Sequence, residues 1–280
     1  MRQIAKYVNH KGESVELNGK HVRLNSGQLQ DWALSYSTVN GRSGSFRRSA
    51  KEVPIAAVVM AKTNADGIAA RNALYEVAIV DVEANKPGRL YVGDWYMEGY
   101  FVSSSKGRWW LTDRAADYSL SFLADTPLWT RERTFSFYPI REDSTIGLNF
   151  EHDYAHDYSA FTAGSNLLDN GAILPAPAKI IIYGAAVNPR ITIGGNTYAV
   201  DTAVPDGGIL TIDAPTRTIV KRDRYGAVSN CFHHRAGNQR RGGGSYIFES
   251  IAPGINEVSW DGSFGFDVTL YEQRDEWRWE

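Results

Sequence analysis

The sequence predicts a mainly β protein made of two β-sandwich domains, the first of which holds a single α-helix and a projecting hairpin arm. Apolar and polar residues alternate over many short segments, as in half-buried strands. Aromatic residues, which favour strands, are abundant, with 8 Trp, 15 Tyr and 11 Phe. Only one segment has helical spacing. The 280 residues suffice for two separate cores.

The chain opens with strand signals. A β-hairpin is predicted over residues 15–24, where alternating apolar residues flank an Asn-Gly pair at 18–19, which favours a type I′ turn. The period-two spacing of Trp32, Leu34 and Tyr36 then predicts a further strand with one buried face.

Residues 40–48 combine glycine with positive charge, so they are predicted to project as a loop or hairpin arm before the apolar run 53–61 returns to the sheet. An aromatic side chain among cations suits a contact with another subunit. The residues expected to make this contact are Asn40, Gly41, Arg42, Gly44, Phe46, Arg47 and Arg48.

One helix is predicted over residues 65–82, with Asn64 as its N-cap and Pro87-Gly88 ending it. Four apolar residues lie at helical spacing and predict the buried side. They are Ile68, Tyr75, Ile79 and Val82. Val77 and Val80 lie off this stripe, which leaves open a helix that is covered on more than one side.

Strands resume after the helix, near 90–92, 97–102, 118–122 and 134–137. Regular periodicity disappears at 141–177, which predicts a connector between domains 1–140 and 178–280.

The last hundred residues consist of short strands at even spacing, which predicts a β-sandwich or jelly roll. The expected strands or hairpins cover 180–183, 191–200, 210–219, 246–248 and 264–271. In the last of these, Phe264, Phe266, Val268 and Leu270 alternate strictly with other residues.

Candidate metal sites are weak. His152 and His156 are four residues apart, but the zinc-protease motif has Glu directly after its first His and this chain has Asp153. His233 and His234 are adjacent and on a strand would point to opposite faces. We therefore predict no metal, no cofactor and no catalytic residue.

Candidate catalytic acids include Glu142/Asp143, Glu151/Asp153 and Glu272/Asp275/Glu276, but a glycosidase needs two of them across a sugar-sized cleft. The chain has no Gly-x-Ser-x-Gly elbow and no P-loop. The stretch Arg235–Arg241 is basic but contains no aromatic residue, so a solvated or subunit-contacting connection is expected rather than a nucleic-acid site.

Composition narrows the partners and the compartment. The net charge of −2 gives no global field that would attract nucleic acid. Cys231 is the single cysteine, which excludes an intrachain disulfide. No signal-peptide core is expected at the N-terminus, and no window approaches the roughly 20 apolar residues of a membrane span.

Several segments taken in order resemble the distal tail protein (Dit) family of siphophages. Those of the second half are "YGAAVNPRITIGGNTYAV" (183–200), "GGILTIDAPTRTIV" (207–220), "YGAVSNCFHHR" (225–235), "SYIFESIAPGINEVSW" (245–260) and "FDVTLYEQRDEWRW" (266–279). Those of the first half are "GRSGSF" (41–46), "GYFVSSS" (99–105), "DYSLSFLADTPLW" (117–129) and the connector "HDYAHDYS" (152–159). The connector departs from the family where His and Ala replace an aromatic residue and proline.

The resemblance implies a galectin-like second domain and a homohexameric ring at the phage tail tip, in one or two stacked rings. The implied partners are the tail tube protein, a tail-associated lysin or tail fibre hub, and receptor-binding or baseplate proteins. DNA would pass transiently through the central channel, and no membrane is implied. The protein would be synthesised in the host bacterial cytoplasm and reside in the virion.

An alternative function is carbohydrate binding by Trp and Tyr side chains of the second sandwich, in recognition of the host cell wall. Fold alone does not carry sugar binding with it. A hydrolase is a third possibility, and it requires turnover of cell-wall polymers that depends on one carboxylate.

Overall fold

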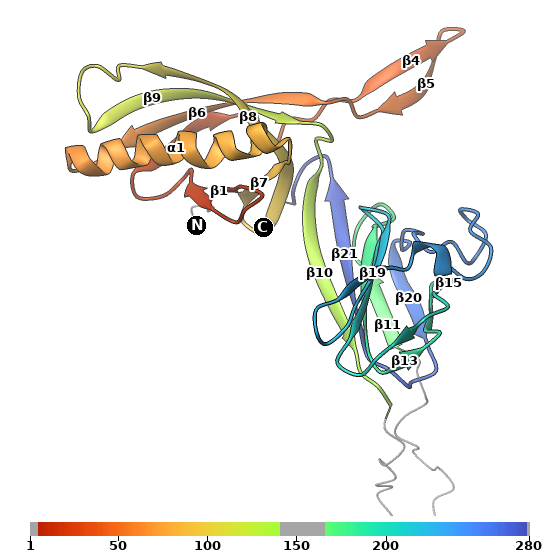
Figure 1. Ribbon diagram of the computed structural model, residues 1–280. Helices are drawn as coiled ribbons and strands as arrows, with labels where there is room; N and C mark the ends of the chain where they lie inside the picture. The colour runs from red at the N-terminus through yellow and green to blue at the C-terminus, as the bar shows by residue number, and fades with distance from the viewer. Residues whose placement is uncertain (1–4, 141–165, 279–280) are drawn as a thin grey trace, which may run out of the picture. The chain divides into compact units, whose positions relative to one another are not determined.

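The computed structural model describes residues 5–140 and 166–278. It divides into two compact units, Met1–Arg131 with Gln273–Glu280, and Glu132–Glu272. The described residues are mainly β with one α-helix, which confirms the predicted fold class (Figure 1). The last residues of the chain group with the first unit, whereas the sequence predicts 178–280 as one domain.

The first unit holds two sheets that share one long strand. Its elements are β1 (Ala5–Val8), β2 (Ser14–Glu16), β3 (Val22–Gly27), β4 (Ser35–Val39), β5 (Arg42–Arg47), β6 (Lys51–Met60), α1 (Asn64–Ala84), β7 (Gly88–Val92), β8 (Trp95–Gly107), β9 (Ala115–Ala124) and the start of β10 (Trp129–Phe137). One sheet runs β2–β1–β7–β8 and the other β3–β6–β9–β8.

Strand β8 changes sheets at Gly99. Residues 95–99 pair with β7, and residues from Tyr100 onward pair with β9. A side chain at Gly99 would collide with the Leu123 carbonyl oxygen and the Phe122 ring, so glycine permits the two backbones to approach at this corner. The core of the unit includes Tyr7, Leu17, Ile55, Leu90, Phe122 and Trp129.

Helix α1 begins one residue earlier than predicted. Its N-cap is Thr63, whose hydroxyl accepts a hydrogen bond from the Asp66 N–H at 3.1 Å, and not Asn64. The predicted buried stripe is wrong: Ile68, Tyr75 and Val82 are exposed. The buried positions are Gly67, Leu74 and Asp81.

These three buried residues are spaced seven apart, so they do share one face of the helix. Only Leu74 is apolar and large. Gly67 lies against the Asp113 carbonyl, where a side chain would collide. Asp81 can be buried because its carboxylate accepts hydrogen bonds. Hydrophobicity alone therefore cannot identify the packed face.

The predicted hairpin over 15–24 is also wrong. Strand β2 pairs with β1, while β3 pairs with β6 in the other sheet. Alternation in two consecutive strands fits a crossover between sheets as well as a hairpin, because the pattern records burial and not the pairing partner. The strand predicted around Trp32–Tyr36 begins only at Ser35 and has no buried face.

The second unit is a sandwich of two main sheets. Its elements are the rest of β10, β11 (Asn166–Asn170), β12 (Ala178–Tyr183), β13 (Ala186–Val187), β14 (Arg190–Ile193), β15 (Asn196–Ala199), β16 (Ala203–Val204), β17 (Ile209–Asp213), β18 (Thr218–Arg222), β19 (Val228–Asn230), the 3₁₀ turn η1 (Phe232–His234), β20 (Gly254–Ser259) and β21 (Phe266–Arg274). One sheet contains β19–β18–β17–β12–β21 and the other β11–β20–β14–β15.

Most strands predicted in this half are present. Ile191 pairs with Tyr198, Ile212 pairs with Ile219, and the alternating residues of 264–270 are buried. Two expectations fail. Residues 246–248 form a turn instead of a strand, and β11, within the predicted connector, pairs with β20. No helix among the described residues is long and apolar enough to cross a membrane.

Candidate functional site

The sequence-predicted arm is a two-stranded hairpin of β4 and β5. The strands pair from Ser35–Arg47 to Val39–Arg42. Asn40 and Gly41 both have positive φ, 51° and 75°, as a two-residue type I′ turn requires. The hairpin extends beyond the sheet that contains β6 and β9, within the first unit (Figure 1). The arm therefore exists, while its contact with another subunit stays a prediction.

Every residue of β4 and β5 is exposed. The Tyr36 and Phe46 rings lie side by side, with centroids 6.4 Å apart, and Val39 near the tip is 63% exposed. An isolated two-stranded hairpin is marginally stable in water, and open strand edges invite another chain. The arm thus has the properties of a segment that a partner completes.

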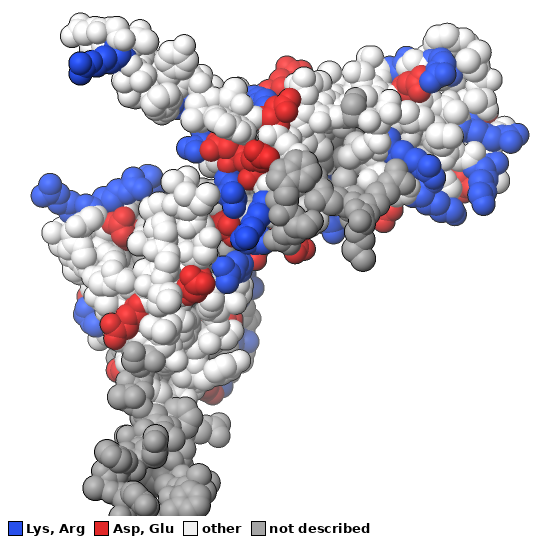
Figure 2. Space-filling model, turned by 180° about the vertical axis from the view of Figure 1, so that it is seen from behind, with Lys and Arg blue, Asp and Glu red and all other residues white. Residues whose placement is uncertain are grey.

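The charge of the arm has one sign. Residues 32–48 include Arg42, Arg47 and Arg48 and no acidic residue. The space-filling view likewise shows basic and uncharged side chains, and no acidic ones, on the outer part of the arm (Figure 2). A receiving surface would therefore combine apolar area with acidic groups.

Arg48 is an exception among the predicted contact residues. Its guanidinium donates two hydrogen bonds to the carboxylate of Asp275, at 2.6 and 2.7 Å. These bonds raise the pKa of Arg48. Arg48 therefore serves a contact inside its own chain, which the sequence did not indicate because the two residues are 227 positions apart.

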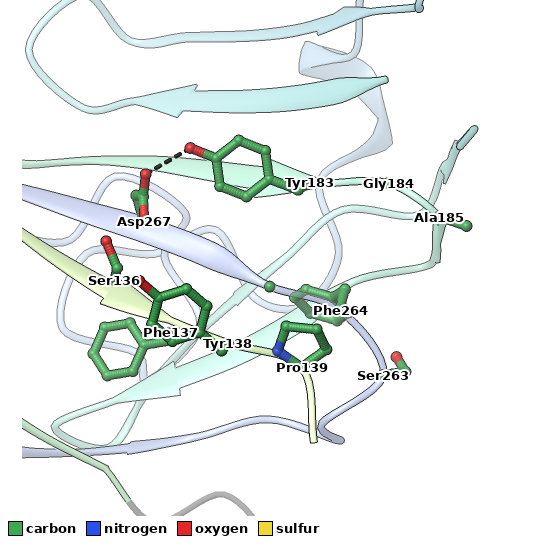
Figure 3. Close-up of a pocket in the computed structure, with 11 residues that line it drawn as sticks. Ser136, Phe137, Tyr138, Pro139, Tyr183, Gly184, Ala185, Ser263, Phe264 and Asp267 are labelled. Carbon is green, nitrogen blue, oxygen red and sulfur yellow. Dashed lines mark hydrogen bonds between the residues drawn. The ribbon is translucent and has the colours of Figure 1, made fainter. Parts of the chain in front are cut away.

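The second unit contains an open pocket of about 420 Å³ (Figure 3). It lies where the end of β10 meets the end of β12 and the start of β21. The Tyr183 hydroxyl donates a hydrogen bond to Asp267 at 2.6 Å, across neighbouring strands. This hydrogen bond, with smaller effects of burial and of the Asp267 charge, raises the pKa of Tyr183 to about 12.

The pocket joins aromatic and polar groups. Tyr138 is 77% exposed and Tyr183 is 42% exposed, while Phe137 and Phe264 are buried in its wall. Ser136, Ser263 and Asp267 supply hydroxyl and carboxylate groups. The sequence signal for this site is only alternation on two strands, so sequence reasoning missed it.

The predicted metal and catalytic candidates do not gather into a site. His152, His156 and the carboxylate pairs of 142–153 lie outside the described residues. In the part of the chain that is described, no three His, Cys, Asp or Glu side chains could hold one metal ion. Glu272 is 3% exposed, and Asp275 pairs with Arg48.

The basic stretch Arg235–Arg241 contacts its own unit. The Arg235 guanidinium lies over the Phe232 ring, 3.7 Å from its centroid, and donates a hydrogen bond to the Phe232 carbonyl at 2.6 Å. Arg241 approaches Glu249 at 3.9 Å. Two of the arginine side chains in this stretch therefore have partners within their own unit, and their charge does not require a nucleic acid or another polyanion.

Comparison with known proteins finds matches among solved structures only. No family model matches the sequence, and a search of curated proteins finds no match. The Dit protein of phage SPP1, described as a paradigm of the hub adsorption apparatus in phages that infect Gram-positive bacteria, superimposes with a TM-score of 0.59 at 10% identity. That alignment covers 98% of this chain and 100% of the other.

A chain of the phage P2 baseplate in its activated conformation with Ca matches with a TM-score of 0.61 at 11% identity. It covers 99% of this chain and 100% of the other. The alignments therefore extend over both units. The chain has the fold of the phage distal tail, or Dit, proteins.

Proposed function

We propose that this chain is a noncatalytic hub of a siphophage tail tip. It forms a homohexameric ring, or two stacked rings, that joins the tail tube to tail-associated and receptor-binding proteins during assembly and host attachment. The observation that carries the proposal is the structural likeness to phage hub and baseplate chains over nearly the whole length of each chain. The protein would reside in the virion after synthesis in the host cytoplasm.

In this proposal the domain predicted as 1–140 builds the ring and 178–280 forms the outer platform for other tail proteins. The exposed arm supports it, since a hairpin with two open edges and apolar side chains suits a head-to-tail contact that closes into a ring. Asn40 to Arg47 would meet the next copy, while Arg48 acts within its own subunit.

The mass of the purified full-length protein in solution tests the proposal. We expect hexameric rings by light scattering and electron microscopy, alone or with adjacent tail proteins. The double variant Val39→Ser/Phe46→Ser should lose rings, because both side chains are exposed on the arm. Tyr225→Ser, which removes an 82% exposed ring from the second unit, serves as the matched control. Monomers only, even with tail partners present, would overturn the proposal.

A second candidate function is carbohydrate binding, favoured by the pocket between Tyr138, Tyr183 and Asp267. Exposed aromatic rings can lie against the apolar face of a sugar ring, and a carboxylate accepts hydrogen bonds from its hydroxyl groups.

Binding of the full-length protein to cell-wall polysaccharide tests this candidate. Tyr138→Ala/Asp267→Asn should weaken binding at least about tenfold, the effect of losing about 1.4 kcal/mol. Tyr225→Ala, distant from the lining residues in the sequence and more exposed, should leave it unchanged. Equal retention of glycan by wild type and both variants, or no binding by wild type, excludes the pocket as a sugar site.

A further inference from the structure

The base of the arm is where the chain enters β4 and where it leaves β5, and contacts hold it on both of these sides. On the entering side, the Trp129 indole N–H donates a hydrogen bond to the Leu29 carbonyl at 3.0 Å, and the Lys51 ammonium donates one to the Asp31 carbonyl at 2.5 Å. On the leaving side, Arg48 binds Asp275 through two hydrogen bonds. All these residues belong to the first unit.

The C-terminal segment 275–277 takes part on both sides. Asp275 holds the leaving side directly. Trp277, 6% exposed, packs edge-on against Trp129, with ring centroids 4.7 Å apart and an interplanar angle of 78°. Since Trp129 is fully buried and bonds Leu29, Trp277 supports the entering side through Trp129.

The arm depends on this base for its direction. Within the described residues, each residue of β4 and β5 is exposed, so the hairpin does not pack on the body of its unit. Strands rise about 3.3 Å per residue, so an arm of this length reaches on the order of 20 Å from its base. A rotation of about 15° at the base would move the tip by about 5 Å, comparable to the spacing of paired strands.

We propose that the C-terminal segment 275–277 is a brace that fixes the direction of the arm, and that this direction determines whether the arm can meet a second copy of the chain. The inference rests on the proposed role of the arm in ring formation. Asp275, Arg48 and Trp277 are positioning residues in this scheme. Residues 275–277 thereby gain a role in assembly.

The chain offers a matched control for the ion pair. Arg108 and Asp117 form a second bidentate pair in the same unit. This pair is exposed and lies at the Gly107–Asp117 end of the β8–β9 pairing, away from the base of the arm. Asp275→Asn and Asp117→Asn therefore remove the same chemistry at two places. The swapped pair Arg48→Asp/Asp275→Arg tests whether the contact, and not either residue alone, is needed.

Two measurements on the full-length protein test the bracing of the arm separately from the assembly of the ring. Spin labels at Ser37→Cys on the arm and Ser119→Cys on β9 report the direction of the arm in dilute monomer, since the native Cys231 is buried. The concentration at which half the protein is in rings reports assembly. Thermal unfolding checks that each variant is folded.

We expect Asp275→Asn to broaden the label-to-label distance distribution and to raise the half-assembly concentration about fivefold or more. Asp117→Asn should do neither, and the swapped pair should restore both. A wild type that never assembles refutes the ring while the label distances still test the brace. If Asp275→Asn and Asp117→Asn give the same narrow distribution and the same assembly, the brace is wrong.

Discussion

Asp81→Ala is expected to lower the free energy of unfolding of the first unit by about 3 kcal/mol. Asp81 lies on α1 and is completely buried. Its carboxylate accepts hydrogen bonds from the Tyr7 hydroxyl and from the His10 backbone N–H at 2.8 Å, and it lies 2.5 Å from His10 Nδ1. Alanine would leave the buried Tyr7 hydroxyl and the half-buried His10 groups without this acceptor, and each buried group that loses its partner costs about 1–3 kcal/mol.

Burial and the hydrogen bond to Asp81 both raise the pKa of Tyr7, so its hydroxyl stays protonated and must find an acceptor. Urea unfolding followed by tryptophan fluorescence measures the effect, because Trp95 and Trp129 are buried in this unit. Glu83→Ala removes an exposed carboxylate two positions away on the same helix and should change stability by less than about 0.5 kcal/mol. Similar losses in both variants would contradict the hydrogen-bond argument.

Phe266→Ala is expected to destabilise the second unit by about 3–5 kcal/mol. Phe266 is completely buried on β21. Its ring is stacked on Phe137, with centroids 4.7 Å apart, and Trp260 packs edge-on against it at 5.1 Å. Truncation leaves a cavity and removes the aromatic contacts on both sides, and a close-packed interior closes such a cavity only partly.

Unfolding of this variant can be followed by the fluorescence of Trp260, which loses a ring neighbour. The matched control is Tyr225→Ala, which removes an aromatic side chain that is 82% exposed in the same unit. It should stay within about 0.5 kcal/mol of wild type. Should the two truncations cost the same, Phe266 is not a packed core residue.

The strands of the second unit were predictable because their pairing is local. Ile191 meets Tyr198 across the short Gly194-Gly195 turn, and Ile212 meets Ile219 across a short turn that begins Asp213-Ala214-Pro215. The turn residues and the alternation of apolar residues then predict the same hairpin. The arm was predictable for a related reason, since Asn40-Gly41 imposes its own turn without help from the rest of the fold.

The candidate site was predictable only in part. The arm residues Asn40 to Arg47 lie together on the hairpin as expected, but the partner of Arg48 comes from the far end of the chain. Tyr183 and Asp267 meet because β12 and β21 pair, although 84 positions separate them. No local pattern encodes either contact, because each depends on which strands become neighbours.

By itself, the sequence determined where most of the strands lie, where the single described helix lies and which hairpin projects from the first unit. Those features follow from alternation, capping and turn residues, which act over a few positions. Only the tertiary structure decided that β2 and β3 enter different sheets, that Gly67, Leu74 and Asp81 form the packed face of α1, and that Asp275 and Trp277 support the arm. Such contacts join residues far apart in the chain, and their energies depend on fit and on satisfied hydrogen bonds instead of hydrophobicity at one position.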